Sequence, residues 1–249
     1  MRLTAYLSKI ADSDTIEALW DAHVAKMADY GFDRLLYGFT RHRTRTSLGD
    51  PGDFLVLSNH SRAYNDVVMA ERHYIDAPMA HWALGHDGAK GWKPVEEIEQ
   101  AYPLSAAARR VMEFNREMGV LAGYTISFKS VSARSKGAIA LTARPGLDQA
   151  AVDAVWDEHG ADILLMNNIV HLKILTLPYN PPHRCLTRRQ REVLEWVGDG
   201  KTTLDIALLL GLTVATVEKH LRLAREALDV ETTAQAVMKA AFANQMFVI

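Results

Sequence analysis

Apolar residues near the N-terminus recur at helical spacing: Ile16, Leu19, Trp20, Val24 and Met27. They predict a helix over 14–29, with Ser13 or Asp14 as its N-cap and Gly31 at its end. Runs rich in strand-forming residues predict strands at 33–41, 53–59, 123–131 and 137–143. Helical spacing returns at 61–74, 103–118 and 147–175. Helices before, between and after a few strands indicate an α/β domain in which helices sandwich an antiparallel sheet.

The last quarter of the chain shows only the helical period and is divided by glycines. A first segment starts after Thr187 and ends near Gly198, and a second covers 203–210 and stops at Gly211. Thr213 can cap a third segment, whose buried stripe is Val217, Leu221, Ala224 and Leu228. A fourth, alanine-rich segment covers 233–244. This pattern predicts a small all-α domain of four helices.

Three prolines mark the boundary between the two patterns. Pro178, Pro181 and Pro182 remove backbone donors and bias the residues before them toward extended geometry. We therefore predict a first domain at 1–176, a linker at 177–185 and a second domain at 186–249.

Composition narrows the class of protein. The 249 residues are 49% hydrophobic and 23% charged, which excludes a disordered chain. A single cysteine, Cys185, excludes an intrachain disulfide and fits a reducing, cytoplasmic environment. The N-terminus lacks the apolar core of a signal peptide, and no run of eighteen apolar residues predicts a membrane span.

The charge distribution leaves room for a nucleic-acid partner. A net charge of −2 excludes a uniformly basic surface. Four arginines nevertheless gather within eight residues that contain no acid: Arg184, Arg188, Arg189 and Arg191. Such a local cluster can add general attraction to phosphate.

The second and third C-terminal segments fit a helix-turn-helix. A tight glycine turn joins the two helices, and the second of them has a single buried stripe. The outer face of that helix then carries Thr216, Glu218, Lys219 and Arg222. The third segment would then enter the major groove of DNA. Any other small helical bundle remains the alternative on pattern alone.

This region also contains several short sequence motifs. LT at 186–187, REVL at 191–194, GKT at 200–202, LGLT at 210–213 and TVEKHL at 216–221 closely resemble the DNA-binding domain of LuxR-type transcription regulators. The resemblance implies base contacts by Glu218, Lys219 and Arg222. It implies phosphate contacts by four residues near helix N-termini: Lys201, Thr202, Thr213 and Thr216.

This resemblance also implies partners. Such regulators bind double-stranded DNA at pseudo-palindromic promoter sites as homodimers, and RNA polymerase is a further candidate partner. Two residues depart from the family pattern. Gln190 replaces a structural glutamate, and Glu218 stands where a lysine is common. A carboxylate repels phosphate and can accept a hydrogen bond from cytosine, so the preferred DNA site is expected to be idiosyncratic.

The segment 58–92 is rich in aromatic residues and histidine, which suits a pocket for a small amphipathic ligand. It resembles, more weakly, the acyl-homoserine lactone-binding domain of LuxR-type regulators, an α/β/α sandwich. The resemblance implies ligand contacts by five residues: His60, Tyr64, Asp76, Trp92 and Thr142. His60 and Tyr64 replace the family's tyrosine and tryptophan, and Asp76 is separated from Pro78 by one extra residue. Thr142 would substitute for a hydroxyl that Ala140 lacks.

Three functions remain open at this point. The first is a quorum-sensing-type regulator that binds an acyl-homoserine lactone or a similar hydrophobic signal and needs no cofactor. The second is a DNA-binding regulator whose N-terminal domain is refitted or ligand-independent. The third, an enzyme acting on acyl signals, is disfavoured because the sequence contains neither a Gly-x-Ser-x-Gly nor a His-Glu-x-x-His motif, so no catalytic or metal-binding residue is assigned.

Overall fold

A computed structural model describes residues 2–93, 97–98, 103–179 and 184–246. The chain divides into two compact units, Met1–Leu175 and Thr176–Ile249. Part of the predicted linker, 180–183, lies outside the described residues. In the part of the chain that the structure describes, no helix has the length and apolar character needed to cross a membrane.

The first unit is built on a five-stranded antiparallel sheet. Its strands are β1 (Phe32–Thr40), β2 (Leu55–Ser58), β3 (Gly88–Gly91), β4 (Gly123–Ser127) and β5 (Lys136–Ala143), in the order β2-β1-β5-β4-β3. β5 is the central strand and pairs with β1 and β4; Tyr37 of β1 lies opposite Ile139 of β5. Side chains alternate between the two faces of each strand, so both faces of the sheet need a cover.

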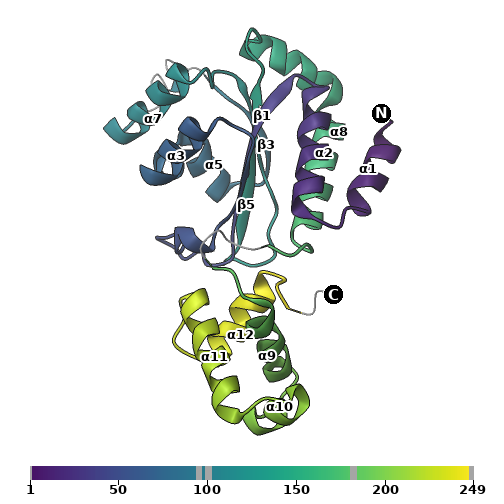
Figure 1. The fold of residues 1–249 in the computed structure, drawn as a ribbon. Coiled ribbons are helices and arrows are strands. Elements are labelled where there is room, and N and C mark those ends of the chain that lie inside the picture. The colour runs from purple at the N-terminus through teal and green to yellow at the C-terminus, as the bar shows by residue number, and fades with distance from the viewer. Residues whose placement is uncertain (1, 94–96, 99–102, 180–183, 247–249) are drawn as a thin grey trace. The chain divides into compact units, whose positions relative to one another are not determined.

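Helices cover both faces (Figure 1). One layer contains α1 (Leu3–Ala11), α2 (Ile16–Ala28) and the long α8 (Gln149–Ile174). The other contains α3 (Arg62–Ala70), α4 (His73–Asp76), α5 (Pro78–Gly85) and α7 (Ala106–Glu117), and the short 3₁₀ turn η1 (Pro51–Asp53) precedes β2. The predicted sandwich of helices around an antiparallel sheet is confirmed.

Buried polar side chains tie the α2–α8 layer together. His23 of α2 contacts the Tyr6 hydroxyl at 2.7 Å and the Asn167 side-chain oxygen of α8 at 3.0 Å. Farther along α8, His171 lies 2.9 Å from the Tyr37 hydroxyl and stacks on the ring of Phe128. Burial lowers the pKa of both histidines to about 4, so both are neutral near pH 7.

Local details differ from the sequence predictions. Thr15 caps α2 by accepting from the Ala18 N–H, in place of Ser13 or Asp14. The predicted helix at 61–74 is interrupted by Arg72, whose backbone is left-handed with φ of 55°. The strand predicted at 123–131 ends at Ser127, because a serine-rich turn follows. Neither α1 nor β3 was predicted.

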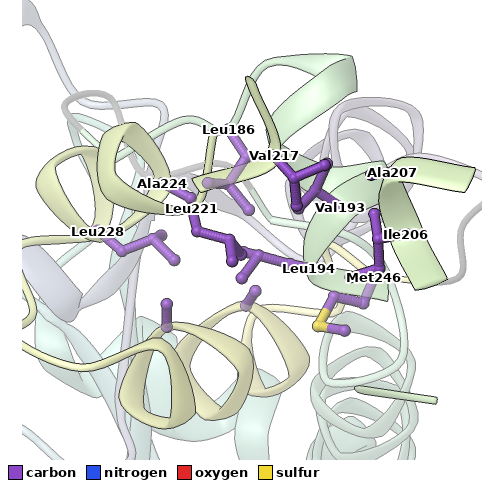
Figure 2. Packing of buried hydrophobic residues seen from close by; sticks show 12 residues of the cluster. Leu186, Val193, Leu194, Ile206, Ala207, Val217, Leu221, Ala224, Leu228 and Met246 are labelled. Atoms are coloured by element: carbon purple, nitrogen blue, oxygen red, sulfur yellow. The ribbon is translucent and has the colours of Figure 1, made fainter. Parts of the chain in front are cut away.

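The described residues of the second unit form four helices, each preceded by a threonine cap. They are α9 (Arg188–Gly198), α10 (Thr203–Leu210), α11 (Val214–Leu228) and α12 (Thr233–Phe242). The caps are Thr187, Thr202, Thr213 and Thr232. Apolar side chains from all four helices meet in one core (Figure 2). The predicted four-helix domain is confirmed.

Candidate functional site

A cavity of about 780 Å³ lies in the first unit against the sheet face that α3, α4, α5 and α7 cover. Its wall is mainly apolar and includes Leu36, Val56, Val68, Met69, Leu84, Val111 and Met112. The volume falls within the range of small-molecule sites, and an apolar wall with few polar groups is their usual composition.

Aromatic side chains form the polar end of the cavity. The Tyr64 ring of α3 lies between those of His60 and Phe114, with centroids at 4.3 and 5.5 Å. Its hydroxyl donates to the Asn115 side-chain oxygen at 3.0 Å. Burial raises the pKa of Tyr64 to about 12, so the hydroxyl remains a donor. Burial and, to a smaller extent, the charge of Arg34 lower the pKa of His60 to about 4, which leaves the imidazole neutral near pH 7.

Two threonines on adjacent strands present hydroxyls to the same cavity. Thr125 of β4 accepts a hydrogen bond from the Trp92 indole N–H at 2.9 Å. Thr142 of β5 is 1% exposed, and its hydroxyl has no hydrogen-bond partner among the described residues. A buried hydroxyl without a partner is unfavourable, so Thr142 is available to a bound polar group.

Asp76 does not lie at this cavity, contrary to the sequence prediction. It ends the short helix α4, whose His73 and Tyr74 line the cavity together with Ala77, Pro78 and Met79 of the following segment. Ala77, the extra residue before Pro78, lines the wall, and Asp76 is not among the lining residues. The other four predicted residues, His60, Tyr64, Trp92 and Thr142, all line the cavity.

Sequence reasoning missed Asn115 and Thr125. Each lies on the inward face of its element, Asn115 on α7 and Thr125 on β4. The alternation of β4 could have identified Thr125, because Tyr124 and Ile126 on either side point to the opposite face. Asn115 had no comparable signal, because a single polar residue in a polar helix is typical of the surface.

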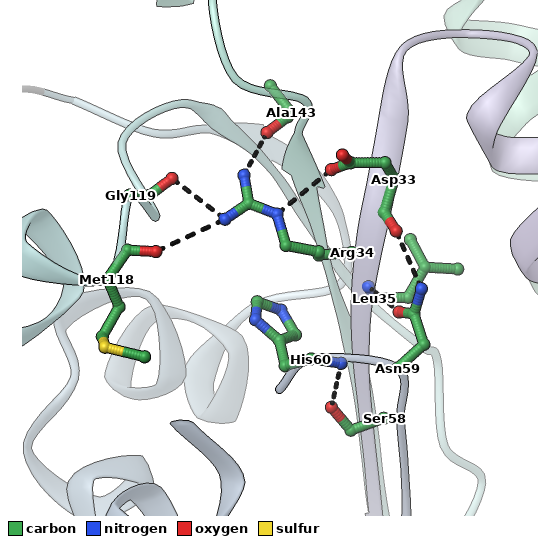
Figure 3. Close-up of polar contacts among 9 residues, drawn as sticks. All are labelled: Asp33, Arg34, Leu35, Ser58, Asn59, His60, Met118, Gly119 and Ala143. Carbon is green, nitrogen blue, oxygen red and sulfur yellow. Dashed lines mark hydrogen bonds and ion pairs between the residues drawn. The ribbon is translucent and has the colours of Figure 1, made fainter. Parts of the chain in front are cut away.

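Arg34 fixes the backbone at one end of the cavity (Figure 3). Its guanidinium donates to the carbonyl oxygens of Gly119 at 3.1 Å and Ala143 at 2.7 Å. Beside it, the Asn59 side chain bridges β1 by accepting from the Leu35 N–H at 2.6 Å and donating to the Asp33 carbonyl at 2.7 Å. These bonds join β1, the end of α7 and the start of α3, so they hold His60 against the cavity.

The second unit forms a helix-turn-helix from α10 and α11. Gly211 makes the turn with a left-handed φ of 63°, a conformation that glycine adopts without steric cost. Val217, Leu221 and Ala224 of α11 face the core, which leaves Glu218, Lys219 and Arg222 exposed.

The predicted DNA-contacting residues occupy two kinds of position. Lys201 and Thr202 precede α10, and Thr213 and Thr216 lie at the start of α11. The Thr202 hydroxyl donates to the Asp205 carboxylate at 2.6 Å, and the Thr213 and Thr216 hydroxyls lie 2.9 Å apart. The Thr202 and Thr213 hydroxyls also cap α10 and α11 by accepting from the Asp205 and Thr216 N–H groups at 3.2 Å. The phosphate contacts of these residues remain predictions.

The outer face of α11 carries one internal ion pair. The Arg222 guanidinium contacts the Glu226 carboxylate at 2.6 Å, and both side chains are more than half exposed. An exposed pair of this kind is worth at most about 1 kcal/mol, so it can open for a base edge.

Gln190 pairs with Thr187 at the start of α9. Its side-chain oxygen accepts from the Thr187 N–H at 2.7 Å, and the Thr187 hydroxyl accepts from the Gln190 N–H at 3.3 Å. This reciprocal capping box starts α9.

Two family models match this arrangement. The autoinducer binding domain matches residues 15–174, and the luxR family of bacterial regulatory proteins matches residues 184–240. The chain belongs to the LuxR family. The cavity lies within the first match and the helix-turn-helix within the second.

Two named transcription regulators are similar in sequence to parts of this LuxR-family member. It is 33% identical over 137 residues to the quorum sensing-dependent regulator RpaR of Rhodopseudomonas palustris, a match covering 54% of this chain and 52% of RpaR. The chain thus matches about half the length of RpaR. The transcriptional activator LuxR of Aliivibrio fischeri is 22% identical over 204 residues, covering 75% of this chain and 78% of LuxR.

Solved structures of family members share the fold. The crystal structure of Escherichia coli SdiA matches with a TM-score of 0.52 at 16% identity, over 99% of this chain and 98% of SdiA. CepR2 of Burkholderia cenocepacia, described as an N-acylhomoserine lactone-dependent factor, matches with a TM-score of 0.50 at 17% identity, over 69% of this chain and 92% of CepR2.

Proposed function

We propose that this LuxR-family chain is a transcription regulator whose DNA binding is controlled by a small hydrophobic signal of the acyl-homoserine lactone class. One observation carries the proposal. A single chain combines an apolar cavity containing an unpartnered buried hydroxyl, Thr142, with a separate helix-turn-helix unit. The cavity supplies a place for the signal and the helix-turn-helix a means of reading DNA.

The polar groups of the cavity suit a ligand with carbonyl oxygens. The Thr142 hydroxyl is a donor, and neutral His60 can donate from one ring nitrogen. The Tyr64 hydroxyl would donate to the ligand in place of its hydrogen bond to Asn115. An acyl-homoserine lactone offers a ring carbonyl and an amide carbonyl, and its acyl chain would lie along the apolar wall. Because Asp76 is not at the cavity, the ligand amide N–H needs another acceptor, and the Asn115 side-chain oxygen is the candidate we favour.

Regulation would act through a homodimer on DNA. Two copies of α11 would read two half-sites of a pseudo-palindrome about one helical turn apart. Glu218, Lys219 and Arg222 would contact bases, while Lys201 and Thr202, at the start of α10, would contact phosphate. We infer that the protein acts in the cytoplasm, with RNA polymerase as a further candidate partner.

A second candidate function is DNA binding that needs no signal. The position of Asp76 outside the cavity favours it, because the carboxylate expected to accept from the ligand amide N–H is not among the lining residues. Ala140, which lines the cavity without a hydroxyl, points the same way.

A ligand panel separates the two functions. Thermal melting of the full chain with acyl-homoserine lactones of increasing chain length should show one length with the largest rise in melting temperature. Ring-opened forms of the same compounds are the matched control. DNase footprinting with that ligand should then show stronger protection of a promoter fragment. Equal protection without any ligand would favour the second candidate, and no sequence-specific protection under either condition would refute both.

A further inference from the structure

Two loops of the first unit gather positive charge at one end of its sheet. Residues 41–49 follow β1, and residues 128–135 connect β4 to β5. Together they contain Arg41, Arg43, Arg45, Lys129 and Arg134 and no acidic residue. The chain up to residue 182, in contrast, carries nineteen lysines and arginines against twenty-two acids, a net charge of −3. The positive charge is thus concentrated on an otherwise acidic unit.

The two loops are held side by side by their backbones. The Arg43 N–H donates to the Arg134 carbonyl oxygen at 2.8 Å. Each loop is also bonded internally: the Thr44 N–H donates to the Ser47 carbonyl oxygen at 2.7 Å, and the Ser135 N–H to that of Ser132 at 3.1 Å. The geometry therefore presents basic side chains from both loops on one surface without further folding.

Four of these side chains are available to a partner. Arg45, Lys129 and Arg134 are exposed and Arg43 is half-buried, and none of the four forms an ion pair with a residue that the structure describes. We call these four residues the basic rim. Arg41 lies outside the rim because its guanidinium packs over the Phe39 ring at 5.2 Å.

The acidic residues near the basic rim are engaged by other groups. Asp87 lies near Lys129, but its carboxylate is held by Lys136 at 2.8 Å. Asp50, at the end of the first loop, accepts from the Gly52 N–H at 2.8 Å. The local field therefore stays positive, and such a field attracts polyanions.

We propose that the basic rim binds the phosphate backbone of DNA beside the site read by the helix-turn-helix. This inference rests on the proposed function, because the duplex is delivered by the second unit of the same chain. The rim and the helix-turn-helix belong to one chain, so a duplex bound by the second unit stays tethered to the first. Tethering raises the local concentration of phosphate around the rim.

DNA fits the rim better than a lipid surface does. Val131, at the tip of the second loop, is the only exposed large apolar side chain of the two loops, all of whose residues the structure describes. Peripheral membrane binding usually combines basic residues with several large apolar or aromatic ones. Contacts to phosphate alone need only the cations, and each contact adds about 0.9 to the slope of log affinity against log salt.

The test compares two quadruple variants of the full chain. The rim variant is Arg43→Gln, Arg45→Gln, Lys129→Gln and Arg134→Gln. The control variant is Lys9→Gln, Arg62→Gln, Arg110→Gln and Arg144→Gln, four exposed cations that are dispersed over the same unit and remove the same net charge. Circular dichroism melting checks that both variants fold, and the double variant Arg45→Gln/Lys129→Gln serves if the rim variant does not.

Fluorescence anisotropy then measures affinity from 50 to 300 mM salt on two duplexes. One ends at the edges of the footprint, and the other adds 15 base pairs on each side. On the flanked duplex the rim variant should lose up to about 0.9 of salt slope per cation removed, and on the short duplex it should match the wild type. The control variant should match the wild type on both. An unchanged slope for the rim variant, or an equal loss in the control, would overturn the proposal.

Two further measurements distinguish this proposal from membrane binding and from a failure of the proposed function. Loss of binding to phosphatidylglycerol vesicles in the rim variant, with DNA slopes unchanged, would assign the rim to a membrane and overturn the DNA proposal. If the wild type gives no sequence-specific footprint, the proposed function fails, and the slopes are compared on a 40-base-pair nonspecific duplex. A normal wild-type footprint together with equal salt slopes for the rim variant and the wild type would refute DNA binding by the rim and leave the proposed function intact.

Discussion

Replacing Thr142 with valine removes a hydroxyl and keeps the shape of the side chain. This hydroxyl is buried and has no hydrogen-bond partner among the residues that the structure describes. Leaving a buried donor unsatisfied costs about 1–3 kcal/mol, so Thr142→Val should stabilise the ligand-free protein by about that amount. For a domain of this size, each kcal/mol raises the melting temperature by about 2–4 °C.

Ligand binding should respond with the opposite sign. If the signal accepts a hydrogen bond from Thr142, the valine variant loses about 0.5–1.5 kcal/mol of binding free energy, or about two- to tenfold in affinity. The expected signature is therefore a higher melting temperature without ligand and a smaller rise with it. Urea denaturation and isothermal titration with the best ligand of the panel measure the two effects.

Thr125→Val provides a matched control on the neighbouring strand. Thr125 is also buried at the cavity, but its hydroxyl accepts from the Trp92 indole N–H. Its loss leaves that N–H unpaired and should destabilise the ligand-free protein by about 1–3 kcal/mol. Destabilisation by Thr142→Val, or unchanged ligand affinity in that variant, would refute the assignment of Thr142 as a ligand contact.

Three further predictions concern pH, the cavity and the reading helix. Burial lowers the pKa of His171 to about 4, against about 6.5 in the unfolded chain. The unfolded chain therefore binds a proton first, so the contribution of neutral His171 to stability is complete above pH 6.5 and is lost as pH falls toward 4. At pH 5 the loss of unfolding free energy is about 2 kcal/mol. Urea denaturation should therefore show that the unfolding free energy falls between pH 7.5 and pH 5 by about 2 kcal/mol less in His171→Gln than in the wild type. An equal fall in the two proteins would contradict this prediction. Asp76→Asn should leave ligand affinity unchanged, whereas Tyr64→Phe should lower it about two- to tenfold by titration, and a loss in Asp76→Asn would place that residue at the site after all. Arg222→Ala should cost about 1–3 kcal/mol and relax preference at one base pair, while Lys201→Ala should weaken all sites alike and reduce the salt slope by about 1; uniform weakening by Arg222→Ala in a panel of duplexes would end its role as a base reader.

The elements with a clear apolar period could be predicted from the sequence. The stripe of α11 and the long α8 both follow from residues repeated at helical spacing. β3 could not, because its sequence is GAKG and the strand pairs with β4 only through its backbone. α1 has only two buried residues, Tyr6 and Ile10, which is too short a stripe to establish a period.

The candidate site was predictable where the chain follows the family motif without a length change. Tyr64 and Trp92 reach the cavity from positions that the resemblance indicates. Asp76 does not, because one inserted residue before Pro78 changes which side chain of the segment faces inward. The missing partner of Thr142 could not be read from sequence either, since satisfaction of a buried hydroxyl depends on every neighbouring element.

The distribution of buried side chains indicates where a signal would exert control. The second unit has a continuous apolar core of its own and four capped helices, so its fold does not depend on a ligand (Figure 2). The first unit instead surrounds a cavity of about 780 Å³ and leaves the Thr142 hydroxyl unpaired. A ligand at one hundred times its Kd would stabilise that unit by about 2.7 kcal/mol. We therefore expect the signal to set the stability of the first unit, and through it the population of chains competent to hold two reading helices on DNA, without reshaping α11.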